Sequence, residues 1–346
     1  HSFPTRRSSD LAANGCARST VKETYEFILG DLNKAIELLA NTKKTRSDKR
    51  YVSLDVAYGI RARVHLTMHN YADALKDAEA ALASTSSVPY SSAAVSKPTF
   101  IDIEDASWMW GILITDKDRV STTGICNFPS HMGSLNYGYA SVGGWRRISP
   151  KLYNQIPESD VRKGWFLDDT GVSVNLPAAA QAYITKKGAP VYTQVKYGPM
   201  NDEWGSNNNA TDVILMRVEE MYLIKAEAQA MNNDVSGGVN TLNSFVNTYR
   251  DPSYKCTATT GEAVQEAVWH QRRIEFWGEG LAYFDIMRLN KGVNRLGCGF
   301  PKTAVFNIAA GDPVQIYSIP NKEVQYNPLL ENNPLVSAPT PIPDEE

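Results

Sequence analysis

Apolar side chains recur at every third or fourth position between Val21 and Leu39, the spacing that places residues on one face of an α-helix. Thr20 and Glu23 stand before this run with the three-residue spacing of a capping box, which satisfies two otherwise unpaired backbone amides. The pattern predicts a helix that begins at this box and presents one apolar stripe. The stripe consists of Val21, Tyr25, Ile28, Leu32, Ile36 and Leu39.

A pair of shorter helices, separated by a tight turn, is predicted over residues 53–84. The small residues Ala62, Ala74 and Ala81 would let two antiparallel helices approach closely, and Tyr58 stands four residues before Ala62. This spacing resembles a tetratricopeptide helical hairpin. One such hairpin cannot bury its own apolar face, so partner hairpins are expected.

The candidate partners lie in the second half of the chain, at residues 213–250 and 261–290. Gly278 and Gly280 interrupt the later block and indicate a break between two short helices. One buried stripe is predicted across this break, with charged pairs three residues apart on the flanking face. The stripe consists of Ile274, Trp277, Leu281 and Phe284, and the pairs are Arg272 with Glu275 and Asp285 with Arg288.

Residues 90–210 have a different character. Glycine, asparagine, serine and proline interrupt every periodic run, which predicts loops with short helices or strands. Five of the seven tryptophans lie in this segment, together with Tyr137 and Tyr139. Aromatic side chains in glycine-rich loops are harder to explain as core than aromatic side chains in helices. The five are Trp108, Trp110, Trp145, Trp165 and Trp204.

Charge and composition exclude several classes of protein. The 346 residues carry a net charge of −3, so no basic field would attract nucleic acid or anionic lipid. No apolar run approaches the ~20 residues that a membrane-spanning helix requires. The four cysteines never form a C-x-x-C pair, which argues against structural zinc and against a thioredoxin-like motif.

The sequence contains no recognisable catalytic motif. His65 and His69 are four residues apart on a predicted helix, but the glutamate of H-E-x-x-H is missing, so a zinc protease is excluded. Glu275 and Glu279 could form a carboxylate pair for glycoside hydrolysis, yet on one helix they project side by side rather than across a cleft. We predict a structural role for both glutamates, no metal site and no cofactor.

The N-terminal residues do not fit the pattern that follows them. Residues 1–11 resemble the conceptual translation of a sequencing adapter joined to a broken gene, and we interpret residues 1–19 as an artefactual or disordered terminus. Cys16 superficially resembles a lipidation site, but no export signal precedes it, so it is interpreted as an ordinary cysteine. Residues 20–346 are predicted to form a single domain that lacks its N-terminal part.

Five segments, in a fixed order, resemble the SusD/RagB family of outer-membrane nutrient-binding lipoproteins. "RRIEFWGEGLAYFDIMRLN" resembles its C-terminal helix pair, "ILMRVEEMYLIKAEA" an earlier helix, and "SIPNKEVQYNPLLENNP" its closing loop. "TYEFILGDLNKAIELL" resembles the helix before the tetratricopeptide unit, and "ISPKLYNQIPESDVRKGWF" a middle segment. The resemblance covers residues 20–334. It implies a mainly α, SusD-like fold, in which a tetratricopeptide-like helical-hairpin scaffold carries large irregular loop insertions.

The expected organisation of that domain follows from the resemblance together with the periodic pattern. Helices are expected at 20–89, a loop-rich ligand region at 90–210, further helices at 211–292, and a closing loop and tail at 293–346.

The resemblance also implies a function. Such a protein binds oligosaccharides at the cell surface without catalysis and delivers them to a SusC-like TonB-dependent transporter. It is an outer-membrane lipoprotein, and its lipid anchor is expected in the missing N-terminal part. The loops suit this role, because a sugar stacks its C–H face on Tyr or Trp while its hydroxyls bind amide or charged groups. The predicted ligand-binding residues are Asn136, Tyr137, Tyr139, Trp145 and Arg146, followed by Trp108 and Trp110.

Three alternatives stay open at this point. A peptide-binding member of the same family would use the same scaffold. A glycoside hydrolase would need two carboxylates that face each other across the aromatic cleft. A tetratricopeptide adaptor would bind another protein's helix or tail, in a groove lined by helices rather than by tryptophan-bearing loops.

Overall fold

The computed structural model describes residues 15–42, 45–118, 121, 127–337 and 339. The chain forms two compact units, Leu32–Asp285 and a second one that combines Ile286–Glu346 with the N-terminal stretch up to Asp31. The predicted artefactual or disordered terminus lies, as far as residue 14, outside the described residues. The single domain expected over 20–346 stays a prediction.

The first helix, α2 (Val21–Ala40), begins with the predicted capping box. The Thr20 amide donates to Glu23 Oε2 at 2.8 Å, and the Glu23 amide donates to Thr20 Oγ1 at 3.2 Å. The predicted stripe is buried only in part, since Ile36 is buried whereas Val21 is 73% exposed. Spacing predicts which residues share a face, but burial also requires an element that covers the face.

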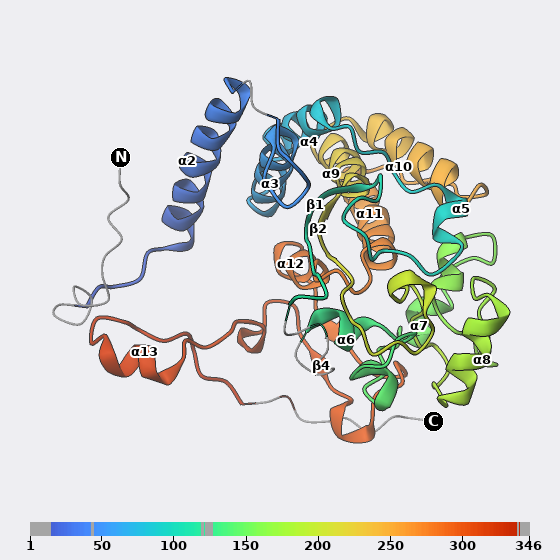
Figure 1. Ribbon diagram of the computed structural model, residues 1–346. Helices are drawn as coiled ribbons and strands as arrows, with labels where there is room; N and C mark the ends of the chain where they lie inside the picture. The colour runs from blue at the N-terminus through green and yellow to red at the C-terminus, as the bar shows by residue number, and fades with distance from the viewer. Residues whose placement is uncertain (1–14, 43–44, 119–120, 122–126, 338, 340–346) are drawn as a thin grey trace. The chain divides into compact units, whose positions relative to one another are not determined.

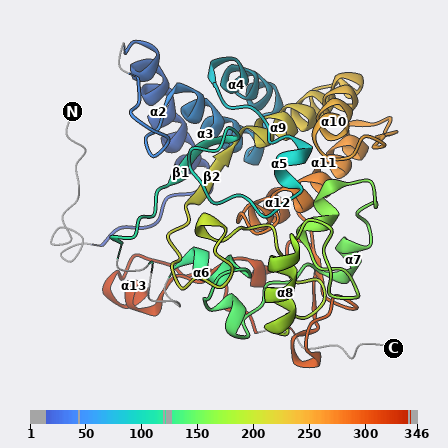
Figure 2. The same cartoon turned by 45° about the vertical axis from the view of Figure 1, so that its right-hand side comes forward.

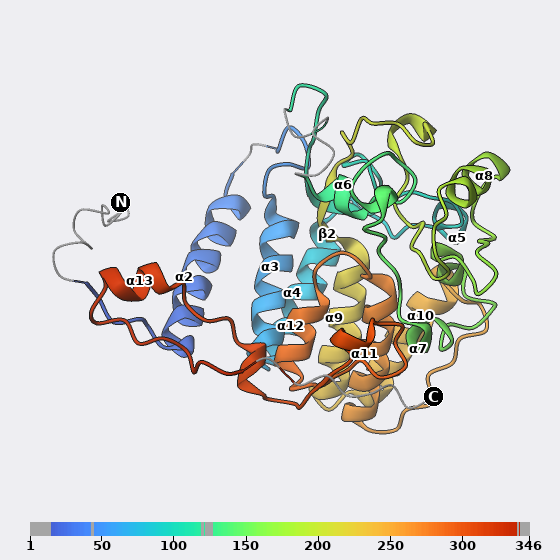
Figure 3. The same cartoon turned by 90° about the horizontal axis from the view of Figure 1, so that it is seen from below.

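The larger unit contains the predicted helical scaffold (Figure 1, Figure 3). Its first hairpin turns where the sequence predicted, and Ala62, Ala74 and Ala81 are completely buried between the helices. The second helix of this hairpin packs on the next hairpin, whose first helix also contacts the third helical block, so each hairpin is covered by another. The helices are α3 (Leu54–Thr67), α4 (Tyr71–Ser84), α9 (Val218–Met231), α10 (Val235–Tyr249), α11 (Gly261–Glu275) and α12 (Ala282–Arg288).

One helical prediction is wrong at its start, because residues 213–217 form a strand. β2 (Val213–Arg217) pairs antiparallel with β1 (Trp108–Ile112), with Trp108 opposite Arg217. Val213 and Ile214 are β-branched and favour this extended pairing over a helix. The two strands lie between the helical hairpins and the loop-rich region (Figure 2).

The break at Gly278 and Gly280 is confirmed, but the single stripe across it is wrong. Both glycines adopt positive φ, 81° and 82°, which reverses the chain between α11 and α12. The helical phase is therefore lost at the break. Ile274 before it is buried, whereas Phe284 after it is 61% exposed.

The loop-rich region has the irregular structure that the sequence predicted. Its core is aromatic, and the ring of Phe100 meets that of Trp165 edge to face at 5.3 Å between centroids. The short helices α6 and α8 lie on the far side of β1 and β2 from the hairpins (Figure 2). The elements are α5 (Ser92–Val95), α6 (Phe128–Met132), η1 (Ala140–Val142), α7 (Pro150–Tyr153), η2 (Val161–Trp165), α8 (Ala178–Lys186) and η3 (Met200–Asp202).

Apart from the first part of α2, the described part of the second unit consists of short elements. The Asn327 side chain accepts from the Cys16 amide at 3.2 Å and donates to the Cys16 carbonyl at 2.8 Å. Among the described helices of the chain, none is long and apolar enough to cross a bilayer. The elements are β3 (Val293–Asn294), η4 (Lys302–Ala304), β4 (Asn307–Ile308), η5 (Pro313–Gln315) and α13 (Asn321–Tyr326), and β3 pairs antiparallel with β4.

The close approach of α3 and α4 gives a first prediction. Ala81→Leu should destabilise the protein by about 1–3 kcal/mol, because the added carbons have no space in the interface. Urea unfolding monitored by circular dichroism would measure it. Ala72→Leu is the matched control on the exposed side of the same helix and should leave the unfolding midpoint nearly unchanged. Equal effects of the two substitutions would contradict the proposed packing.

Candidate ligand-binding surface

The predicted tyrosines lie on the surface of the loop-rich region. Tyr137 is 48% exposed and Tyr139 is 42% exposed. The Tyr139 ring stacks on His131 with 4.6 Å between centroids, and the Arg146 guanidinium lies 5.9 Å from the Tyr139 centroid. We call Tyr137, Tyr139, His131, Arg146 and Lys187 the aromatic surface.

Cationic groups accompany both rings of this surface. Lys187 Nζ lies 5.3 Å from the centroid of Tyr137 and 5.7 Å from that of Tyr183. Arg146 donates to the Gly144 carbonyl at 2.8 Å, and its other terminal nitrogen lies 3.2 Å from His131 Nδ1. Exposed rings beside hydrogen-bond donors are the combination that a hydroxylated ligand requires.

Backbone contacts and a glycine fix the positions of the rings. The Tyr137 amide donates to the Ser206 carbonyl at 2.7 Å, and the Tyr139 amide donates to Ser130 Oγ at 2.9 Å. A Cβ at Gly144 would lie 2.6 Å from the Tyr139 ring, so only glycine allows this loop to close over it. The aromatic surface is therefore held in place before any ligand arrives.

Of the predicted residues, Asn136 lies beneath the surface and Trp145 is partly buried. Asn136 is 1% exposed and donates to Asn209 Oδ1 at 2.6 Å, whereas its own Oδ1 has no partner among the described residues. Trp145 is partly buried and packs against a small apolar cluster around Leu135 and Ile184. Both residues support the loop that carries the tyrosines.

The tryptophans of β1 are not gathered at the aromatic surface. Trp108 is completely buried, and its indole nitrogen donates to the Tyr90 hydroxyl at 2.7 Å. Trp110 is partly buried and donates to the Arg50 carbonyl at 3.2 Å. A buried ring offers no face to a ligand, so Trp108 is excluded from the proposed site.

Sequence reasoning missed His131 and Lys187. Neither stands in a motif, and Lys187 is 50 or so positions from the tyrosines, so only the folded chain brings it to Tyr137. The sequence offered one indication of this arrangement, because His131 stands only a few residues before the two tyrosines.

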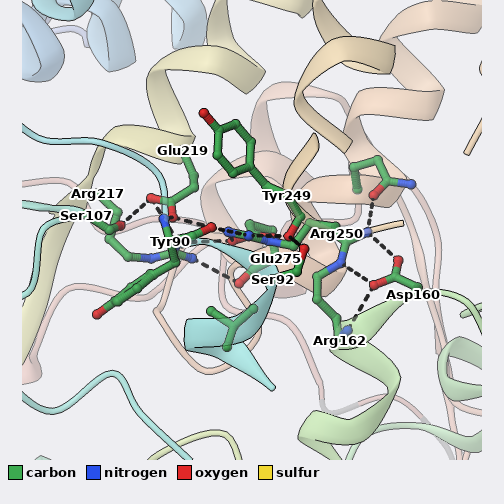
Figure 4. A network of polar contacts seen from close by, with 12 residues as sticks. Tyr90, Ser92, Ser107, Asp160, Arg162, Arg217, Glu219, Tyr249, Arg250 and Glu275 are labelled. Carbon is green, nitrogen blue, oxygen red and sulfur yellow. Dashed lines mark hydrogen bonds and ion pairs between the residues drawn. The ribbon is translucent and has the colours of Figure 1, made fainter. Parts of the chain in front are cut away.

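A network of buried charges connects the loop-rich region to the helical scaffold (Figure 4). Glu275, the last residue of α11, accepts hydrogen bonds from three arginines that are 0% exposed. The distances are 2.8 Å from Arg250 Nε, 3.0 Å from Arg217 Nη1 and 3.3 Å from Arg162 Nη1. Glu275 therefore joins the loop-rich region, the β2–α9 junction and α10 at one carboxylate.

Two further glutamates extend the network. Glu219 accepts from the Tyr90 amide at 2.9 Å and from Arg250 Nη2 at 3.1 Å. Glu279 accepts from Arg217 Nε at 2.9 Å and from Lys196 Nζ at 2.6 Å. Burial lowers the pKa of Lys196 to about 8.

The electrostatics of Glu275 and Glu279 do not suit a catalytic acid. Burial acts to raise the pKa of the Glu275 carboxyl, but Arg250, Arg217 and Arg162 hold it well below its ordinary value. The pKa of Glu279 is likewise lowered, against its burial, by Arg217 and Lys196. A glycosidase acid requires a raised pKa. Both carboxylates are buried and paired with cations, which agrees with the structural role predicted for them.

The pairing predicted for Arg272 is wrong. Its Nε donates to Asp285 Oδ2 at 2.7 Å, because the glycine break returns α12 towards α11 and brings this carboxylate within reach. Glu275, the partner predicted from the three-residue spacing, is occupied by the three arginines of the network.

Comparison with known proteins identifies the family. The family model described as "SusD family" matches residues 162–335, half of the chain. The chain belongs to the SusD family. Three of the five segments that carried the resemblance lie within this match, the middle segment overlaps its start, and the segment at residues 24–39 lies outside it.

Solved structures of the SusD family share the fold. A SusD-like carbohydrate binding protein from Bacteroides vulgatus is 23% identical, with a TM-score of 0.72 over 92% of this chain and 67% of its own. A SusD superfamily protein from Bacteroides thetaiotaomicron is also 23% identical, with a TM-score of 0.73 over 92% of this chain and 68% of its own. The chain thus spans about two thirds of the length of these structures. No curated protein matches it. The mainly α, SusD-like fold is confirmed.

The buried network gives a second prediction. Glu275→Gln should reduce the free energy of unfolding by about 3–5 kcal/mol, because it leaves three buried arginines short of a counter-charge. Glu262→Gln, an exposed position in the first turn of the same helix, is the matched control and should cost less than about 1 kcal/mol. Urea titration of both variants would decide, and similar losses would contradict a central role for Glu275.

A third prediction concerns acid. The folded-state pKa values of Glu275 and Glu279 lie below their ordinary value of 4.5, so their stabilisation is complete above that pH and is lost as the pH falls through the folded values. The urea midpoint should therefore fall as the pH is lowered below about 4.5. In Glu275→Gln the decline should be shallower. Parallel declines in the two proteins would show that other carboxylates control acid unfolding.

Proposed function

We propose that this SusD-family chain binds oligosaccharides at the cell surface without catalysis, as part of a protein that delivers them to a SusC-like TonB-dependent outer-membrane transporter. The observation that carries the proposal is the aromatic surface, whose exposed Tyr137 and Tyr139 rings stand beside cationic and imidazole donors. Partial exposure of both rings leaves apolar area on which a sugar can stack.

The surface suits a hydroxylated ligand more than an apolar one. Tyr139 retains 42% exposure although His131 and Arg146 lie beside it, so a ligand would meet ring carbon and hydrogen-bond donors together. A loop fixed by backbone hydrogen bonds loses little conformational entropy on binding. These properties support recognition of a sugar chain.

The relatives point in the same direction. One similar structure, from Bacteroides vulgatus, is described as carbohydrate binding. Outer-membrane location, a lipid anchor and a transporter partner belong to the proposal, since they follow from the family alone.

A peptide-binding function is the second candidate within the family. Its support is the pair Lys187 and Arg146, which could bind peptide carboxylates as well as sugar hydroxyls. Parallel glycan and peptide arrays would separate the two ligands.

A fourth prediction tests the aromatic surface. Tyr137→Ala and Tyr139→Ala should each weaken binding of an oligosaccharide identified on the glycan array by roughly 1–3 kcal/mol, because each removes a stacking ring. Isothermal titration calorimetry of folded variants would measure the loss.

The matched control is Tyr51→Ala, which removes a tyrosine that is at least as exposed, elsewhere in the same unit. Its affinity should equal that of the unchanged protein. If all three variants bind alike, the ligand does not lie on the aromatic surface, and if only peptides bind, the oligosaccharide proposal is wrong.

A further inference from the structure

A separate cavity of about 450 Å³ opens in the loop-rich region, at α7 and η2. The residues that matter for its chemistry are two tyrosines, three carboxylates and one lysine. They are Tyr153, Tyr192, Glu158, Asp168, Asp169 and Lys163. Its volume lies within the range of small-molecule sites in proteins.

We propose that this cavity binds the ammonium group of an amino sugar. The proposal rests on the oligosaccharide function proposed above and adds to it a second site, with a preference for a cationic saccharide unit. It follows from three independent features of the cavity: an aromatic corner, an unbalanced negative charge, and an internal cation already placed on one of the rings.

The aromatic corner consists of Tyr153 and Tyr192. Their ring centroids lie 5.2 Å apart and the planes are inclined by 58°, so together they form two adjoining walls. Tyr153 is 8% exposed as a residue and lines the cavity, and its hydroxyl has no hydrogen-bond partner among the described residues. A hydroxyl at a cavity wall that has no protein partner is free to bind a ligand.

Two of the three carboxylates, Asp168 and Asp169, are not paired with a protein cation among the described residues. Asp169 is exposed and makes no ion pair within the described part of the chain, and Asp168 accepts hydrogen bonds only from its own turn, at Thr170 and Val172. Burial, followed by the charges of Asp168, Glu158 and Asp169, raises the pKa of Tyr153 to about 12. The three carboxylates are therefore close enough to the Tyr153 hydroxyl to affect a ligand that binds beside it.

The ammonium group of Lys163 already lies against one of the tyrosine rings of the cavity. Lys163 Nζ lies 5.1 Å from the centroid of Tyr153, held there by an ion pair with Glu158. Glu158 is 88% exposed, so this pair is worth little and the ammonium can leave the ring. The ring face is thus an ammonium site with a displaceable occupant.

An amino sugar matches all of these groups at once. Its ring can lie against the tyrosine walls, its hydroxyls can bind the Tyr153 hydroxyl and the carboxylates, and its ammonium can pair with Asp168 and Asp169. A neutral sugar would leave the two carboxylates without a counter-charge. The cavity should therefore discriminate by charge between sugars of the same shape.

The fifth prediction compares glucosamine with glucose by titration calorimetry at about pH 6, where the amine is protonated. Glucosamine should bind more tightly than glucose. Asp169→Asn should weaken glucosamine about two- to fivefold, as expected for one solvent-exposed charge pair. Lys163→Met should strengthen it by a similar factor, because it vacates the Tyr153 face and removes a competing charge.

Asp73→Asn, an exposed substitution of the same kind on α4, is the matched control and should leave glucosamine binding unchanged. The proposal is overturned if glucosamine binds no better than glucose, or if Asp169→Asn has no more effect than Asp73→Asn. Neutral oligosaccharides report separately on the aromatic surface through Tyr137→Ala. One site can therefore fail its test while the other stands.

Discussion

The structure of the larger unit depends on one buried carboxylate, that of Glu275, and on the three arginines that surround it. Isolated charges are excluded from protein interiors because water solvates them far better. Here the desolvation is offset within a balanced set of four cations and four anions. The set consists of Arg162, Arg217, Arg250 and Lys196 with Asp160, Glu219, Glu275 and Glu279.

Balance alone does not explain why such a network would be retained, since apolar packing of the same volume is often at least as stable. Geometry offers a reason. Arg162 comes from the loop-rich region, Arg217 from the end of β2, and Arg250 from the end of α10. Each arginine forks between several acceptors at fixed angles, so the network determines where irregular segments attach to the hairpins. Apolar contacts, which have no preferred direction, would specify this attachment less sharply.

The sequence predicted those parts of the structure that local spacing controls. The capping box at Thr20, the hairpin turn between α3 and α4, and the break at Gly278 all follow from contacts within a few residues. Prediction failed where partners are distant. Arg272 was paired with Glu275 by the three-residue rule, whereas the folded chain pairs it with Asp285 across a turn. Residues 213–217 were placed in a helix because nothing local revealed β1 as their partner.

The candidate site shows the same division. Composition could point to an aromatic loop as a candidate binding region, but exposure separates Tyr137 from Trp108, and exposure is set by tertiary packing. His131 and Lys187 reach the tyrosines only through the fold. The sequence could therefore identify the segment that carries the candidate site, but not which residues of that segment are exposed to a ligand.

The segment 160–163 shows how scaffold and binding chemistry can share a few consecutive residues. Arg162 is completely buried and bonds Asp160 and Glu275, while its neighbour Lys163 lies in the cavity beside Tyr153. In the tight helical turn of η2, successive side chains point in different directions, so one residue can be fixed in the network while the next faces a ligand. Substitutions at the cavity-facing position can then alter ligand preference without disturbing the charges that hold the turn. The buried Arg162 can thus keep the turn in place while substitutions at position 163 change which ligands the cavity binds.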